Sequence, residues 1–156
     1  MKIRLLAVGQ KMPAWVTEGF TDYANRMPPE CRLELIELPL AQRAKSRPLE
    51  RAVREEGERM LAALTGSEQL IALDVRGKSW NTEQLSAELS GWLQGGRDIA
   101  LAIGGPDGLD DVVLERAERR WSLSPLTLPH PLVRVIVAEQ IYRAMSILKN
   151  HPYHRA

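Results

Sequence analysis

The stretch IALAIGGPDG, residues 99–108, places a continuous apolar run directly before a loop of glycine and proline. A short apolar run of this kind is typical of a strand that is buried on both faces of a parallel sheet. A second irregular segment, SLSPLTLPH, follows at residues 122–130. Because glycine and proline leave backbone groups unpaired, two such loops at the ends of neighbouring strands predict a ligand crevice.

Strand and helix patterns alternate along the whole sequence. Apolar runs predict strands at residues 2–8, 32–38, 70–73, 99–103 and 123–128, the third of which ends at Asp74. Helical spacing predicts helices that begin near Pro13, Pro48 and Asn81, and two more over residues 110–121 and 131–150. Asn81 and Gln84 have the spacing of a capping box. The alternation predicts an α/β fold with a mainly parallel sheet flanked by helices.

The composition is that of an ordinary globular protein. The chain has 156 residues, of which 44% are hydrophobic and 26% charged, and its formal net charge is +1. We therefore expect residues 1–156 to form a single domain. The one cysteine, Cys31, excludes an internal disulfide and favours a reduced, cytoplasmic setting. No segment has the apolar length that a membrane span needs, so we expect no membrane partner.

The last predicted helix, residues 131–150, carries apolar side chains on more than one face. That is more apolar surface than packing on a single sheet requires. A homodimer built partly on this helix is the simplest explanation, because two-fold pairing is the commonest oligomeric arrangement. Burial of the second face within the monomer is the alternative.

Three motifs that would indicate other chemistry are incomplete. Gly77-Lys78-Ser79 lacks the upstream glycine of a nucleotide-phosphate loop, and Pro106 breaks the glycine spacing of a dinucleotide fingerprint. His151 and His154 have no third strong ligand nearby, so we expect no metal. A tight turn between strand and helix is the plain alternative to a binding loop at residues 104–108.

Basic residues gather in two places. Arg43, Lys45 and Arg47 lie in a loop that prolines bound, and the tail at residues 151–155 is cationic and holds two of the three histidines. If the fold brings the two clusters to one face, they could contact phosphates. Each cluster alone is better explained as a solvated surface.

Four groups of residues together point to a known family: Ile103-Gly104-Gly105-Pro106-x-Gly108, Ser122-Leu123-Ser124 with Leu128-Pro129-His130, Arg134-Val135 with Glu139-Gln140-x-Tyr142-Arg143-Ala144, and Tyr153-His154-Arg155. In this combination the sequence closely resembles the SPOUT methyltransferases, and among them the bacterial family that methylates N3 of a pseudouridine in 23S ribosomal RNA. The resemblance implies a deep trefoil knot in the C-terminal part, a rare exception to the rule that chains do not thread. It also implies a homodimer that acts on the 23S ribosomal RNA of assembled ribosomes.

The resemblance further implies that S-adenosyl-L-methionine binds in the knot loops. Carried over position by position, the donor-binding residues are Leu73, Gly104, Leu123, Ser124, Pro125, Leu126, Thr127 and Leu128. Their chemistry agrees with this assignment, because adenine needs an apolar slot together with hydrogen bonds to its edge.

The tail supplies the candidate catalytic residues. From residue chemistry, His154 could accept the N3 proton, Arg155 could stabilise the developing imide anion and Tyr153 could stack on the base. The resemblance implies that this tail docks against the cofactor pocket of the partner subunit, while the two basic clusters position the RNA backbone.

Two other interpretations stay open at this point. The chain could be a non-catalytic ribosome- or RNA-associated module that keeps the fold. It could also be a flavodoxin-like small-ligand protein, although the phosphate loop that such proteins carry after their first strand is absent here.

Overall fold

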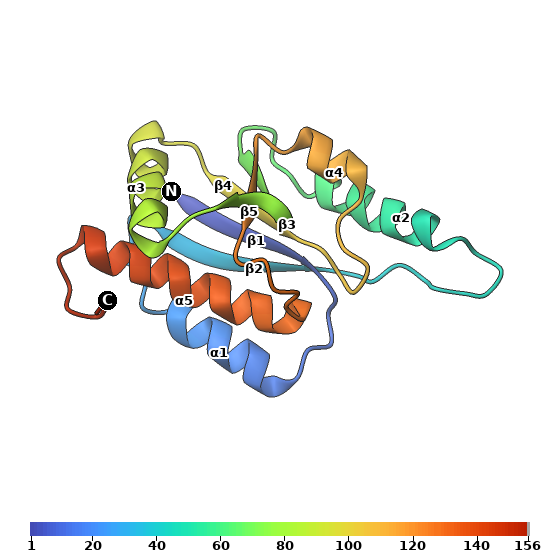
Figure 1. The fold of residues 1–156 in the computed structure, drawn as a ribbon, viewed down its shortest axis with the longest axis horizontal. Helices are drawn as coiled ribbons and strands as arrows, with labels where there is room; N and C mark the ends of the chain where they lie inside the picture. The colour runs from blue at the N-terminus through green and yellow to red at the C-terminus, as the bar shows by residue number, and fades with distance from the viewer. Residues whose placement is uncertain (156) are drawn as a thin grey trace.

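A computed structural model describes residues 1–155; Ala156, the last residue of the predicted domain, lies outside the described residues. Within this range strands and helices alternate without exception (Figure 1). In chain order they are β1 (Lys2–Val8), α1 (Ala14–Ala24), β2 (Arg32–Leu38), α2 (Leu49–Ala62), β3 (Gln69–Ser79), α3 (Thr82–Gly95), β4 (Ile99–Ile103), α4 (Asp111–Arg116), β5 (Arg119–Ser122) and α5 (His130–Leu148).

The strands form one parallel sheet in the order β2-β1-β4-β3-β5. β4 is the central strand and all of its residues are buried. Its isoleucine and leucine side chains join the core on one face of the sheet, and its alanines join the core on the other face. The predicted α/β class with a parallel sheet is therefore confirmed.

Helices cover both faces of the sheet (Figure 1). α5 packs against α1 and α3 on one face, while α2 and α4 pack together on the other. The first layer buries Phe20, Leu89 and Ile141 against the sheet, and the second buries Met60 and Val113. The chain thus changes faces between α4 and α5, and it does so through β5 and the segment that follows it.

Several local predictions hold in detail. The strands predicted at residues 32–38 and 99–103 coincide with β2 and β4. The capping box is present at the start of α3, where the Asn81 side chain accepts from Gln84 N and the Gln84 side chain accepts from Asn81 N, each at 2.8 Å. Such reciprocal bonds satisfy backbone donors that a helix start leaves unpaired.

The strand predicted at residues 123–128 is wrong, and so is the end of the helix before it. α4 ends at Arg116, and β5 comprises Arg119–Ser122 instead. The segment after β5 leaves the sheet because proline removes ladder donors and because serine side chains bind the backbone locally. The Ser122 hydroxyl donates to Ser124 O at 3.1 Å, and the Ser124 hydroxyl accepts from Leu126 N at 3.0 Å.

The third predicted strand ends too early. β3 continues past Asp74 to Ser79, and its pairing with β5 is interrupted between Leu73 and Lys78. Because β3 lies between β4 and β5, the two predicted binding loops also do not follow directly neighbouring strands. Both loops nevertheless lie at the carboxyl edge of the same sheet.

α5 buries much of its apolar surface within the monomer. Val137, Ile141 and Met145 are buried, whereas Leu132 and Ile136 are only half-buried. The two flanking helices therefore cover more of α5 than the sequence pattern suggested, and an incompletely covered strip remains. Among residues 1–155, no helix has the length and apolar character needed to cross a bilayer.

Candidate functional site

A cleft of about 620 Å³ opens where the middle of β3 and the carboxyl ends of β4 and β5 meet the start of α5. Its volume lies in the usual range for small-molecule sites. The cleft is predominantly apolar, with a few polar groups among leucine, proline and tryptophan side chains. Its lining consists of Leu73, Asp74, Val75, Ile103, Gly104, Gly105, Pro106, Trp121, Leu123, Ser124, Leu126, Thr127, Leu128, Pro129, His130 and Val133.

The structure brings together the residues predicted to bind the donor. Leu73 comes from the middle of β3, Gly104 from the loop after β4, and the others from the segment between β5 and α5. Pro125 is the exception, because it is not part of the cleft lining. Leu126 is strongly exposed, at 71%. The grouping agrees with the predicted binding roles, which stay predictions.

Glycine is required in the loop after β4 because the backbone folds tightly on itself. A Cβ atom on Gly104 would lie 2.5 Å from the carbonyl carbon of Gly108, closer than real Cβ contacts allow. Gly108 itself has a φ of +79°, a conformation that favours glycine, and its N–H donates to Gly105 O at 3.1 Å. Glycine at these positions therefore allows the loop to fold tightly on itself at the margin of the cleft.

Three polar residues of the cleft were missed from the sequence, namely Asp74, Trp121 and His130. Each has a buried side-chain atom without a hydrogen-bond partner in the structure: Asp74 Oδ2, Trp121 Nε1 and His130 Nδ1. Burial and the nearby Arg134 guanidinium lower the pKa of His130, so this imidazole is neutral at physiological pH. His130 ends the Leu128-Pro129-His130 motif that contributes to the family resemblance, so its position was a usable signal.

Arg134 fixes the start of α5 beneath the cleft. Its side chain is fully buried, donates to Glu37 Oε2 at 2.6 Å and also donates to the carbonyls of Val8 and Gly9 at 3.2 and 2.8 Å. A buried guanidinium is costly unless paired, and these bonds supply partners from β2 and the end of β1. The cleft wall is thereby joined to the sheet.

The tail is folded against α5. The Tyr153 hydroxyl donates to Glu139 Oε2 at 2.7 Å, and the Tyr153 ring packs edge-on against Tyr142 with centroids 4.7 Å apart. His154 lies 3.1 Å from the Arg143 guanidinium through Nδ1 and 3.2 Å from Glu83 Oε1 through Nε2. The Arg155 side chain is exposed, and no ion pair joins it to residues 1–154.

Glu139 organises this cluster, and no role was predicted for it. Burial alone would raise its pKa, but the hydrogen bonds from Arg143 and Tyr153 outweigh burial and hold the pKa below its usual value. Burial and the same carboxylate raise the pKa of the Tyr153 phenol. Tyr153 is therefore a neutral hydrogen-bond donor that ties the tail to α5.

The tail does not reach the cleft of its own chain. It folds back along α5 as far as Glu139, which is nine residues from His130 at the cleft, or roughly 14 Å along a helix axis. Within one chain, the tail with its candidate catalytic residues thus contacts the middle of α5, whereas the cleft lies at the start of α5.

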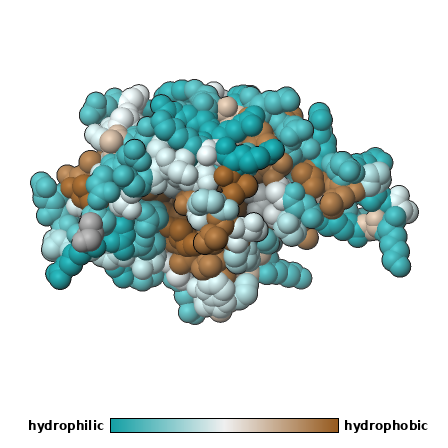
Figure 2. All heavy atoms as spheres, viewed as in Figure 1, coloured by the Kyte–Doolittle hydropathy of each residue, from teal (hydrophilic) through white to brown (hydrophobic). Residues whose placement is uncertain are grey.

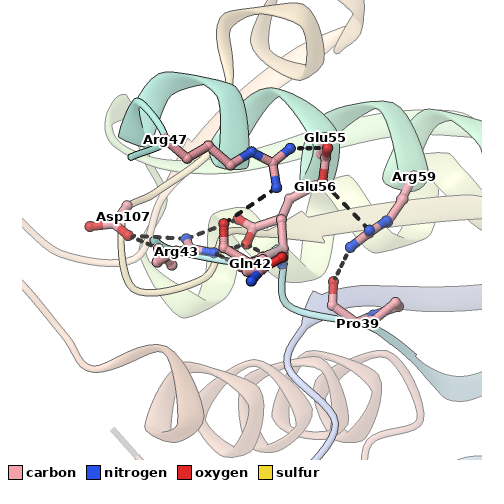
Figure 3. Close-up of polar contacts among 9 residues, drawn as sticks. Pro39, Gln42, Arg43, Arg47, Glu55, Glu56, Arg59 and Asp107 are labelled. Atoms are coloured by element: carbon pink, nitrogen blue, oxygen red, sulfur yellow. Dashed lines mark hydrogen bonds and ion pairs between the residues drawn. The ribbon is translucent and has the colours of Figure 1, made fainter. Parts of the chain in front are cut away.

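The predicted basic cluster is largely engaged with carboxylates (Figure 3). Arg43 pairs with the buried Glu56 and with Asp107, and Arg47 pairs with Glu55. Lys45 forms no ion pair with residues 1–155, and it lines a small hollow together with both arginines. The cluster therefore offers less free positive charge than the sequence suggested.

Comparison with known proteins places the chain in a class. The family described as a predicted SPOUT methyltransferase matches residues 1–154. Together with the parallel sheet and the cleft at its carboxyl edge, this match shows that the chain belongs to the SPOUT methyltransferase family.

More specific relatives bear the name ribosomal RNA large subunit methyltransferase H. The protein of that name from Alkalilimnicola ehrlichii is 60% identical over 156 residues, which covers 100% of both chains. Those from Azotobacter vinelandii and a Marinomonas species are 54% and 52% identical over 155 residues, covering 99% of this chain and 100% of theirs.

Solved structures with much lower identity share the fold. A probable methylase family protein from Haemophilus influenzae aligns with a TM-score of 0.59 at 11% identity, over 99% of this chain and 70% of its own. A putative methylase family protein from Neisseria gonorrhoeae aligns with a TM-score of 0.54 at 16% identity, over 99% and 88%. At these identities the likeness concerns the fold alone.

Proposed function

We propose that this chain transfers a methyl group from S-adenosyl-L-methionine to N3 of a pseudouridine in 23S ribosomal RNA. The observation that carries the proposal is the cleft, where residues from three separate segments form one apolar pocket at the sheet edge in a chain of the SPOUT family. Relatives with more than half of their residues identical are named as methyltransferases of large-subunit ribosomal RNA. The substrate follows from those names and from the sequence motifs.

The residues of the cleft fit S-adenosylmethionine. Leu73, Leu123 and Leu128 provide apolar walls for adenine, and Gly104 and Gly105 bring the loop after β4 to the margin of the same cleft. The unpartnered polar atoms of the cleft fit the hydroxyl, amine and ring-nitrogen groups of such a molecule. The donor, when bound, supplies an activated methyl group, so the protein's task is to align and desolvate the reactants.

The tail provides the chemistry on the RNA side. Once released from its contacts with Arg143 and Glu83, His154 accepts the N3 proton, Arg155 stabilises the resulting anion, and Tyr153 orients the base. Because the tail of one chain stops short of its own cleft, we assign it to the cleft of a partner subunit. A homodimer follows from this arrangement. Figure 2 supports it, since apolar side chains gather over α5 and the segment that leads into it.

The proposal includes a trefoil knot within one domain. Its support is the path of the chain, which crosses between the two helix layers through the segment after β5, beside the loop after β4 that lines the same cleft. A knotted crossing at this place would hold both cleft loops against each other.

We assign the substrate to the assembled ribosome in the cytoplasm. Phosphate contacts by lysine and arginine supply much of the affinity of RNA-binding proteins. Here Arg43 and Arg47 are already paired with carboxylates, and the net charge of the chain is only +1. Additional contacts from a composite ribosomal surface would make up this deficit.

Two measurements test the proposal. Calorimetry with S-adenosylmethionine should show binding, whereas a non-catalytic module with this fold need not bind the donor. Incubation with methyl-labelled donor should then label the RNA of whole ribosomes more than free 23S RNA. Absence of label in ribosomes, large subunits and free RNA alike would overturn the function.

A further inference from the structure

Buried polar atoms without partners are concentrated in the cleft. Asp74 Oδ2, Trp121 Nε1 and His130 Nδ1 all belong to residues that line it, and only Glu68 Oε2 and Arg134 Nε share this property elsewhere in residues 1–155. Buried polar side-chain atoms in proteins are usually hydrogen-bonded. Their concentration at one place therefore points to a bound molecule that completes the hydrogen bonds.

Asp74 is the residue of this group that carries charge. It lies where the pairing between β3 and β5 is interrupted, and its side chain is 11% exposed. Its Oδ1 atom accepts from the backbone N–H of Arg76 at 3.2 Å, which fixes the carboxylate. The Arg76 guanidinium is 3.6 Å away from the same oxygen and 75% exposed, so it leaves Oδ2 without a partner.

The negative charge of Asp74 favours binding of the methyl donor over binding of the RNA. No other carboxylate lines the described cleft. A negative group in an apolar pocket attracts cations and hydrogen-bond donors, and it repels the phosphates of an RNA. S-adenosylmethionine carries a sulfonium, an ammonium and a ribose diol, whereas the RNA brings phosphates. The complementarity is therefore with the methyl donor.

We propose that Asp74 accepts a hydrogen bond from the methyl donor, either from its ribose hydroxyls or from its ammonium group. This inference rests on the proposed function and adds a donor-specific contact to it. Trp121 and His130 complete the polar side-chain surroundings of the same ligand.

The test is calorimetry of the full chain and of Asp74→Asn, which keeps the shape of the side chain but removes its charge. The ligands are S-adenosylmethionine, S-adenosylhomocysteine and 5′-methylthioadenosine, the last of which has the ribose but no ammonium. We expect Asp74→Asn to weaken S-adenosylmethionine binding about ten- to a hundredfold, as for loss of a charge-assisted hydrogen bond. A parallel loss with methylthioadenosine assigns Asp74 to the ribose. A loss with S-adenosylmethionine and S-adenosylhomocysteine, which has the ammonium but no sulfonium, and not with methylthioadenosine assigns it to the ammonium.

The matched control is Asp111→Asn, which neutralises an exposed aspartate on α4 outside the cleft and should bind as the unaltered chain does. Asp74→Ser, a small neutral acceptor, replaces Asp74→Asn if the latter fails to unfold cooperatively. Unchanged donor affinity in the Asp74 variants would overturn the inference, and so would a loss of methyl transfer without a loss of affinity. Failure of the unaltered chain to bind the donor would instead overturn the proposed function.

Discussion

The Arg43 guanidinium donates to Asp107 Oδ2 from both Nε and Nη2, at 3.1 and 3.0 Å, and so joins two loops that are 64 residues apart (Figure 3). The same guanidinium donates to Glu56, which is 3% exposed and also accepts from Ala41 N at 3.0 Å. One arginine thus connects the basic loop, the middle of α2 and the glycine loop of the cleft. The hydrogen bonds to Glu56, and next those to Asp107, raise the pKa of Arg43.

The two carboxylates of this connection should contribute unequally to stability. We expect Glu56→Ala to lower the free energy of unfolding by about 3 kcal/mol, because it leaves a partly buried guanidinium without its main partner. Asp107→Asn should lower the free energy of unfolding by at most about 1 kcal/mol, since the Asp107 side chain of that pair is 34% exposed. Urea denaturation of both variants measures the difference, and equal losses would show that the buried pair has no special role.

Gly104→Ala should disrupt the cleft. Its Cβ atom would lie 2.5 Å from backbone, so the loop must move, and we expect donor binding to weaken by at least tenfold with about 1–3 kcal/mol of lost stability. Gly91→Ala is the matched control, because a Cβ at this position of α3 meets nothing within 4 Å. That variant should bind normally and gain about 0.5–1 kcal/mol. Normal donor binding by Gly104→Ala would contradict the role of the loop.

Tail and cleft should complement each other between subunits. We expect a chain lacking residues 153–156 to bind the donor and transfer no methyl group. Gly104→Ala should be inactive because its cleft binds the donor poorly although its tail is intact. A mixture of the two, exchanged into mixed dimers, should recover part of the activity, because one site then combines an intact cleft with an intact tail. Absence of recovery after verified subunit exchange would place tail and cleft in the same chain.

The neutral state of His130 predicts a pH dependence of stability. Because the pKa of His130 is lowered in the folded chain, the unfolded chain binds more protons below about pH 6.5, the usual value for histidine. Stability contributed by the neutral imidazole is therefore present above that pH, and it is lost as the pH falls toward the lowered pKa. His130→Asn should flatten this part of the profile in thermal unfolding between pH 5 and 8. If stability depends on pH equally in His130→Asn and in the unaltered chain, another group causes this pH dependence.

Lys45 should be the most effective phosphate contact of the basic loop. Its ammonium has no carboxylate partner within residues 1–155, whereas Arg43 and Arg47 do. We expect Lys45→Ala to weaken ribosome binding and to reduce the slope of log affinity against log salt by about one. Binding titrations at several salt concentrations measure both the affinity and this slope. Lys2→Ala, an exposed lysine on β1, is the control that should leave the slope unchanged.

The parts of the fold that local chemistry determines were predictable. β4 and β2 follow from their apolar patterns, and the start of α3 follows from Asn81 and Gln84. The segment after β5 was predicted as a strand because Leu126 and Leu128 have the two-residue spacing of a strand, while the serine hydrogen bonds that turn the chain away depend on three-dimensional geometry. The residues of the cleft were predictable only in part for the same reason.

Long-range pairs were beyond the reach of sequence patterns. Arg134 sits within an apolar run and gives no sign that its partners are Glu37 and the end of β1. Asp74 was read as the end of a strand because its unpaired oxygen becomes visible only once β3 and β5 are placed side by side. That the tail stops short of the cleft of its own chain likewise depends on how far it folds back along α5, which sequence patterns do not indicate.

The central claim is most directly tested by nucleoside mass spectrometry of 23S RNA from ribosomes treated with this protein and S-adenosylmethionine bearing a trideuterated methyl group. Ribosomes should come from cells that lack the modification. We predict that one pseudouridine gains the labelled methyl group at N3, and that Gly104→Ala yields none. A labelled methyl group on another nucleoside, or on no nucleoside, would contradict the account.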